Sequence, residues 1–155
     1  MFNVTFAPES MREMTEKQRE KLAAGRASEM DMRYEYFWVD FDLTVDGFDP
    51  EWFPGIPVLD LMFCLLYSAQ AIREGNPGTI SFTESDMLIH LAPSGEYLSV
   101  ERSWNPTAGS CSIAEFLAGV SRFSGEALEY IARRYPDFEG HPTHRKLLDM
   151  LEQVG

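Results

Sequence analysis

Residues 33–45 have the sequence Arg-Tyr-Glu-Tyr-Phe-Trp-Val-Asp-Phe-Asp-Leu-Thr-Val, and apolar side chains alternate along this stretch. A period of two is typical of a β-strand that buries one of its faces. One face would carry Phe37, Val39, Phe41, Leu43 and Val45. The other face would carry Tyr34, Tyr36, Trp38, Asp40, Asp42 and Thr44. The stretch therefore predicts one strand of a sheet that other elements cover on the first face.

Both strands and helices are expected on either side of this stretch. Short strands are predicted at residues 2–6, 79–83, 87–91 and 97–101, with turn-rich connections at 46–57 and 105–110. Helices are predicted from about Pro57 to Gly75, from a capping box at Ser112 and Glu115, and from Pro142 onward. Consecutive hairpins favour antiparallel pairing. We therefore predict one α+β domain over residues 1–155, with an antiparallel sheet of about four to five strands and helices mainly on one face.

Residues 8–32 form a charged segment with little apolar material. Ser10 with Glu13, and Thr15 with Gln18, both have the spacing of a capping box that opens a helix. Only Met11, Met14 and Leu22 form an apolar stripe. A helix with so narrow a stripe is expected to pack weakly on the rest of the domain.

The net charge of −12 is concentrated in one part of the chain. Residues 34–72 contain seven acids and no lysine or arginine, and they supply seven of the twelve net negative charges. Such a field repels nucleic-acid phosphates and anionic lipid headgroups, so neither is expected as a partner. It attracts cations, and we expect a basic protein partner.

The acids of this segment alternate with large aromatic residues, and exposed Tyr and Trp are preferred anchors of protein interfaces. We predict a partner-binding surface made of Tyr34, Tyr36, Trp38, Asp40, Asp42, Asp46, Asp49, Glu51 and Trp52. In the alternative interpretation, the N-terminal or the last helix covers this face and the aromatic residues form a second small core. The sequence leaves both possibilities open.

Motifs of catalysis and metal binding are missing from the sequence. It contains no GxSxG, Walker-A, GxGxxG or HExxH pattern, and His141 and His144 have no third ligand nearby. We therefore expect a protein without catalytic residues, metal or cofactor. Cys64 and Cys111 are expected to be reduced thiols, and the position of Cys111 at a helix start could lower its pKa. Without a signal peptide or an apolar run of about 20 residues, a cytoplasmic location is expected.

Two other functions stay open. A small-ligand module or minor enzyme could have a site between the sheet and the helix from Ser112, near His90, Glu101, Arg102 and Trp104. Such a site would be a polar pocket. A homo-oligomeric structural protein could instead bury its own aromatic face between subunits.

A resemblance to known proteins is carried by Gly55-Ile-Pro-Val-Leu-Asp60, the apolar helix after it, Phe82-Thr-Glu-Ser85 and the strands that end near Val100. Between about Val39 and Tyr135 the chain resembles a family of small uncharacterised bacterial α+β proteins, which implies a fold and no chemistry. In size, acidity and α+β composition it is also similar to the immunity proteins of polymorphic and contact-dependent toxin systems. That resemblance implies a cytoplasmic protein that neutralises a basic toxin through an acidic surface.

Overall fold

The computed structural model describes residues 1–82 and 85–155, and it confirms the α+β class. The described strands form two antiparallel sheets instead of one. The first has the order β1-β2-β3 and consists of β1 (Phe2–Ala7), β2 (Trp38–Val45) and β3 (Glu51–Pro57). The second has the order β4-β5-β6-β7 and consists of β4 (Gly78–Ser81), β5 (Leu88–Ser94), β6 (Tyr97–Arg102) and β7 (Asn105–Ser112). An isolated bridge between Asp46 and Ser110 joins the end of β2 to β7.

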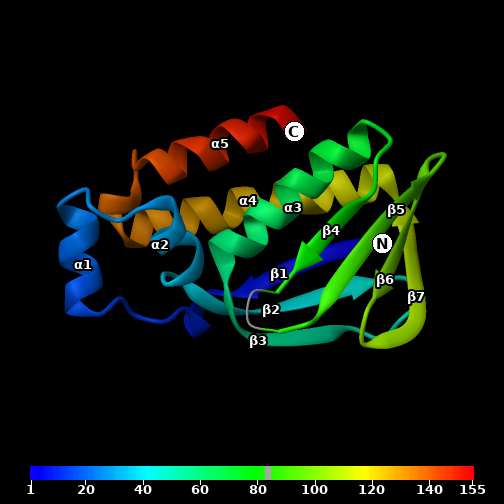
Figure 1. Ribbon diagram of the computed structural model, residues 1–155, viewed down its shortest axis with the longest axis horizontal. Helices are drawn as coiled ribbons and strands as arrows, with labels where there is room; N and C mark the ends of the chain where they lie inside the picture. The colour runs from blue at the N-terminus through cyan, green and yellow to red at the C-terminus, as the bar shows by residue number, and fades with distance from the viewer. Residues whose placement is uncertain (83–84) are drawn as a thin grey trace.

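Three long helices lie together on one side of the strands, as Figure 1 shows. They are α3 (Val58–Arg73), α4 (Ile113–Arg134) and α5 (Pro142–Val154), and each contacts the other two. The predicted capping box opens α4, because Ser112 and Glu115 bond each other's backbone N–H groups. The predicted first-turn proline opens α5, and Gly75, with a φ of +82°, follows the end of α3.

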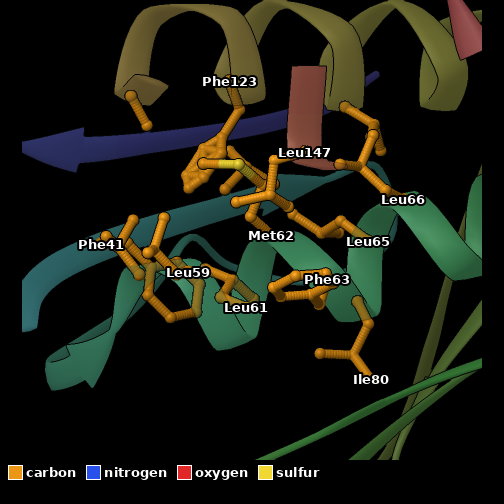
Figure 2. Packing of buried hydrophobic residues seen from close by; sticks show 14 of the residues in the cluster. Phe41, Leu59, Leu61, Met62, Phe63, Leu65, Leu66, Ile80, Phe123 and Leu147 are labelled. Atoms are coloured by element: carbon orange, nitrogen blue, oxygen red, sulfur yellow. The ribbon is translucent and has the colours of Figure 1, made fainter. Parts of the chain in front are cut away.

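The core lies between the helices and the inner faces of both sheets. Helix α3 is central because almost every one of its faces is buried, including Met62, Phe63 and Leu65 (Figure 2). The predicted apolar stripe of β2 is buried throughout, from Val39 to Val45. Since the inner face of this sheet packs on helices, the outer face is the one on which polar residues can remain in water.

The N-terminal segment is divided into short elements. It contains the 3-10 helix η1 (Pro8–Ser10), α1 (Glu16–Ala23) and α2 (Glu29–Tyr34), and a second 3-10 helix, η2 (Pro136–Phe138), precedes α5. The box of Thr15 and Gln18 caps α1 as predicted. The expected helix start at Ser10 is wrong, because the Ser10 hydroxyl donates to the Ala7 carbonyl and accepts from the Asp40 N–H.

Two strands occupy stretches that the sequence predicted as connections. Strand β3 lies within residues 46–57 and contains Pro54 and Pro57, which an edge strand tolerates because one side of its backbone pairs with none of the described strands. Strand β7 begins at Asn105, and its small exposed residues show no apolar alternation. The last predicted residues of the strand at 79–83, and Glu84 of the following turn, lie outside the described residues.

Candidate binding surface

The outer face of β2 and β3 carries a carboxylate and a tryptophan that are both open to water. Asp42 pairs with Trp52 across the two strands and with Thr5 of β1 on its other side. The Trp52 side chain is 60% exposed, and Asp42 is exposed as well. Directly opposed residues of an antiparallel pair have Cβ atoms about 5 Å apart, so the ring and the carboxylate are neighbours. Asp42 and Trp52 are therefore exposed side by side on this face.

The neighbouring part of this face is covered by the chain's own Arg12. Its guanidinium carbon lies 4.7 Å from the centre of the Trp38 ring, a cation–π contact. The Arg12 Nη2 atom also lies 3.4 Å from where a Cβ on Gly55 would stand, so the group extends over β3. Gly55 has a φ of +62°, and its N–H donates to Asp40 Oδ1 at 2.9 Å. Asp40 therefore holds the bend of β3 in place.

Tyr34 and Tyr36 do not share a strand face with Trp38, and that part of the prediction is wrong. Tyr34 ends helix α2, and its carbonyl accepts a hydrogen bond from the Trp38 indole at 3.1 Å. Tyr36 is 1% exposed, and its hydroxyl donates to the Gln18 carbonyl at 3.0 Å. The alternation fails because Phe37 has a left-handed φ of +56°, which turns the chain before β2 begins. Tyr36 is covered by the N-terminal segment, as the alternative expected, but it belongs to the main core and not to a second one.

Glu51 is directed inward and joins the two sheets. Its Oε1 atom lies 2.6 Å from Arg102 Nη1 and 3.3 Å from the Trp104 indole nitrogen. The Arg102 side chain is 4% exposed, and its Nη2 donates to the Thr107 carbonyl. Its guanidinium carbon lies 3.6 Å from the centre of the Phe48 ring. Glu51 thus neutralises a buried arginine, so its prediction as a partner-binding residue conflicts with its structural role.

Asp46 and Asp49 lie in the exposed connection between β2 and β3. The Asp46 carboxylate accepts a hydrogen bond from the Met1 amino group, and the Asp46 backbone forms the bridge to Ser110. Of the exposed acids Asp42, Asp46 and Asp49, only Asp46 makes a side-chain hydrogen bond or ion pair with another residue in the described part of the chain. Their charges face solvent, where they can attract a cationic partner.

A pocket of about 320 Å³ opens beside β3, the edge strand of the first sheet, and it was not predicted from the sequence. Trp38 and Trp52 line it on the outer side, and Leu61 and Phe82 line it on the inner side. Asp60, which also lines it, is 5% exposed and accepts two hydrogen bonds from Arg33, at 2.7 and 3.1 Å. The prolines of β3, which disfavour pairing with a further strand, are the one feature of the sequence that could have indicated an unpaired edge here.

The four residues of the alternative small-ligand site are not brought together beside α4. His90 and Glu101 are opposite each other on β5 and β6, and both are exposed on the outer face of the second sheet. Arg102 and Trp104 instead meet at Glu51, toward the first sheet. A pocket shared by all four is therefore not formed.

Both thiols have pKa values above the ordinary range. Burial raises the pKa of Cys111 to about 11, so the expected lowering by a helix start is wrong. Burial also raises the pKa of Cys64, whose thiol lies 3.9 Å from the Ser81 carbonyl. The described residues contain no group of three or more His, Cys, Asp or Glu side chains that could hold a metal ion.

The two sequence-adjacent histidines have structural roles at the start of α5. His141 Nδ1 accepts from the Thr143 N–H, and its Nε2 lies 2.8 Å from the Ala27 carbonyl. His144 is buried, its Nδ1 accepts from the Gly140 N–H, and burial lowers its pKa. His141 therefore joins the start of α5 to the N-terminal segment, and His144 holds the turn that precedes α5.

Comparisons with protein-family models, with curated proteins and with solved structures found no match to this chain. Among the described helices, none combines the length and the hydropathy needed to cross a bilayer.

Proposed function

We propose that this protein is a non-enzymatic binding protein whose partner is a basic protein. The observation that carries the proposal is the exposed Trp52 beside the exposed Asp42, within a segment that has seven acids and no lysine or arginine. Tryptophan is enriched among the residues that contribute most of the binding energy of protein interfaces. Acidic residues around it accelerate association with a basic partner.

The acids of this segment divide into those that bind other residues of the fold and those that are exposed on the surface. Asp40, Glu51 and Asp60 are engaged with Gly55, Arg102 and Arg33, respectively. Glu35, Asp42, Asp46 and Asp49 remain exposed. All seven charges contribute to the long-range field, whereas only exposed ones can pair directly with a partner. The binding surface is therefore smaller than the whole acidic segment.

We further propose that the partner is a toxin and that the protein acts as a cytoplasmic immunity protein. The support is the net charge of −12, the α+β fold in a small chain and the acidic face just described. Many toxins that act on nucleic acid carry a cationic cleft, and an acidic surface with an exposed aromatic residue is complementary to such a cleft.

The proposal is tested by capture of partners from lysate of the source bacterium at low and moderate salt. The double variant Asp42→Lys/Asp49→Lys should lose the partner. The matched control is Glu126→Lys/Glu152→Lys, which changes one exposed residue of α4 and one of α5. Both double variants change the net charge from −12 to −8. Asp40 is left unchanged because it holds Gly55. Equal losses of the partner in both variants, or no basic protein captured by the parent, would contradict the proposed surface.

A second function is favoured by the pocket beside β3. Its volume of about 320 Å³ is near the lower end of pockets that hold small ligands, about 300–1,000 Å³. A thermal-shift screen with a metabolite panel tests this function, because a ligand that binds only the folded state raises the unfolding temperature. A metabolite that raises the unfolding temperature, together with no captured protein, would favour the small-ligand module over the binding protein.

Formation of a homodimer through the Trp52 face would appear as a doubled mass in solution.

A further inference from the structure

The outer face of β2 and β3 presents two pairs of a tryptophan and a carboxylate. Trp38 and Asp40 form the first pair, two residues apart on β2. Trp52 and Asp42 form the second pair, across the β2–β3 ladder. Both pairs belong to the same sheet face, because residues 38, 40 and 42 alternate with the buried residues Val39 and Phe41.

The chain itself supplies an arginine to the first pair. The Arg12 guanidinium lies over Trp38 at 4.7 Å and extends toward Gly55, whose N–H is bound by Asp40. Trp38 is half-buried, and its ring is in contact with a cation of the chain itself. The Trp38 ring therefore shows that a tryptophan of this face can hold a guanidinium group, while the Asp40 carboxylate is bound to the Gly55 N–H.

The second pair has no such cation among the residues that the structure describes. No Lys or Arg of the ranges 1–82 and 85–155 stacks on Trp52, and none of them forms an ion pair with Asp42. Trp52 is 60% exposed, in contrast to the half-buried Trp38. An aromatic ring and a carboxylate side by side at an open surface can bind a guanidinium group in two ways at once. The planar face of the group stacks on the ring, and the N–H groups at its edge donate to the carboxylate.

We propose that Trp52 and Asp42 form a receptor for one arginine side chain of the basic partner. The assignment rests on the proposed function and specifies the chemistry of its contact. Arginine fits better than lysine because the guanidinium group is planar, can donate two N–H bonds to one carboxylate and is more weakly hydrated. Lysine offers a compact ammonium ion, which can satisfy the carboxylate but not the stacking geometry.

The receptor can be tested without knowledge of the partner, with three short peptides as probes. Gly-Arg-Gly, Gly-Lys-Gly and Gly-citrulline-Gly amides are titrated into the 15N-labelled protein, and the indole N–H signals of the three tryptophans are followed. Trp→Phe variants assign the signals. We expect Gly-Arg-Gly to shift the Trp52 signal saturably and with weak affinity, Gly-Lys-Gly to bind several-fold more weakly, and the citrulline peptide, which lacks the charge, to give no saturable shift.

Substitutions then test each half of the receptor. Trp52→Ala and Asp42→Asn should each reduce the affinity for Gly-Arg-Gly by about five-fold, as followed by the backbone amide signals of β2 and β3. Tyr97→Ala is the matched control, since Tyr97 is another exposed aromatic residue (67%) on the second sheet. Arg12→Ala provides a gain of function: it uncovers Trp38, whose indole signal should begin to respond to Gly-Arg-Gly.

The results separate this receptor from the proposed function. If the citrulline peptide binds as well as the arginine peptide, or if Trp52 shows no saturable shift, the arginine receptor is refuted even when a basic protein is captured from lysate. If the capture is unaffected by Trp52→Ala and Asp42→Asn, the receptor is refuted while the binding protein stands. A saturable, arginine-selective shift at Trp52 that Asp42→Asn weakens supports the receptor, including in the case where no protein is captured and the proposed function fails.

Discussion

Removal of the Glu51 carboxylate should destabilise the protein strongly, because it leaves a buried guanidinium without its counter-charge. The Arg102 side chain is 4% exposed and that of Glu51 is 23% exposed. Loss of one partner of a buried pair costs about 3–5 kcal/mol of the free energy of unfolding. Since Glu51 is the more exposed partner, water can partly replace it. We expect Glu51→Ala to lie near the lower limit, at about 3 kcal/mol.

Two further variants separate charge from hydrogen bonding. Glu51→Gln keeps an oxygen that can accept from Arg102 and Trp104 but loses the charge, so its cost should be about 1–2 kcal/mol. In Glu51→Leu/Arg102→Met no charge is left buried, and such replacements are often neutral or stabilising. This double variant should therefore be more stable than Glu51→Ala.

Equilibrium unfolding in urea, followed by tryptophan fluorescence and circular dichroism, measures these differences. For a chain of 155 residues, about 3 kcal/mol corresponds to a fall in the melting temperature of about 6–12 °C. A Glu51→Ala variant within about 1 kcal/mol of the parent would refute the reasoning, since a surface ion pair contributes no more than that. Glu51 would then be available for the partner, as the sequence predicted.

Three further perturbations test the packing and the titrating groups. Gly119→Ala should lower the free energy of unfolding in urea by about 1–3 kcal/mol, because the new Cβ would lie 2.8 Å from the Phe2 carbonyl oxygen. Gly125→Ala is the control: its Cβ would be 3.9 Å from its nearest neighbour, so this variant should not destabilise α4. Cys111, with a pKa of about 11, should react with Ellman's reagent far more slowly in the native protein than in denaturant, and equal rates would contradict its burial. Burial lowers the pKa of His144 in the folded state below its ordinary value of 6.5. This group should therefore leave the free energy of unfolding unchanged above pH 6.5 and reduce it as the pH falls below 6.5. In acid-unfolding curves, a His144→Gln variant should lose part of that reduction.

The sequence predicted well those elements whose local pattern and tertiary environment agree. The alternation of β2, the continuous apolar character of α3 and the capping box of α4 each predict an element that the structure confirms. In β2 and α4 burial repeats at the period of the element, and in α3 nearly every face is buried, so the local pattern is sufficient in each. The α+β class follows from them.

The rest could not be predicted because long-range contacts decide it. Strand β3 contains Pro54 and Pro57, and only its position at the edge of a sheet makes a strand there acceptable. The left-handed Phe37 is a conformation that a bulky residue rarely adopts, and it interrupts an alternation that the sequence continues without a break. The partners of Glu51 and Asp40 are 51 and 15 residues away in the chain, respectively, so no local pattern indicates their structural roles.

The division between structural and exposed acids determines how binding should respond to mutation. The long-range field depends on the number and position of all carboxylates, so an exposed acid such as Asp49 influences mainly the rate of association and its dependence on salt. Trp52 carries no charge and can act only after contact, so it influences mainly the rate of dissociation. Asp42 is exposed and lies opposite Trp52, so it should influence both rates. Under the proposed function, the acidic segment as a whole should attract the partner, whereas the contact that retains it should be confined to the short ladder where β2 meets β3.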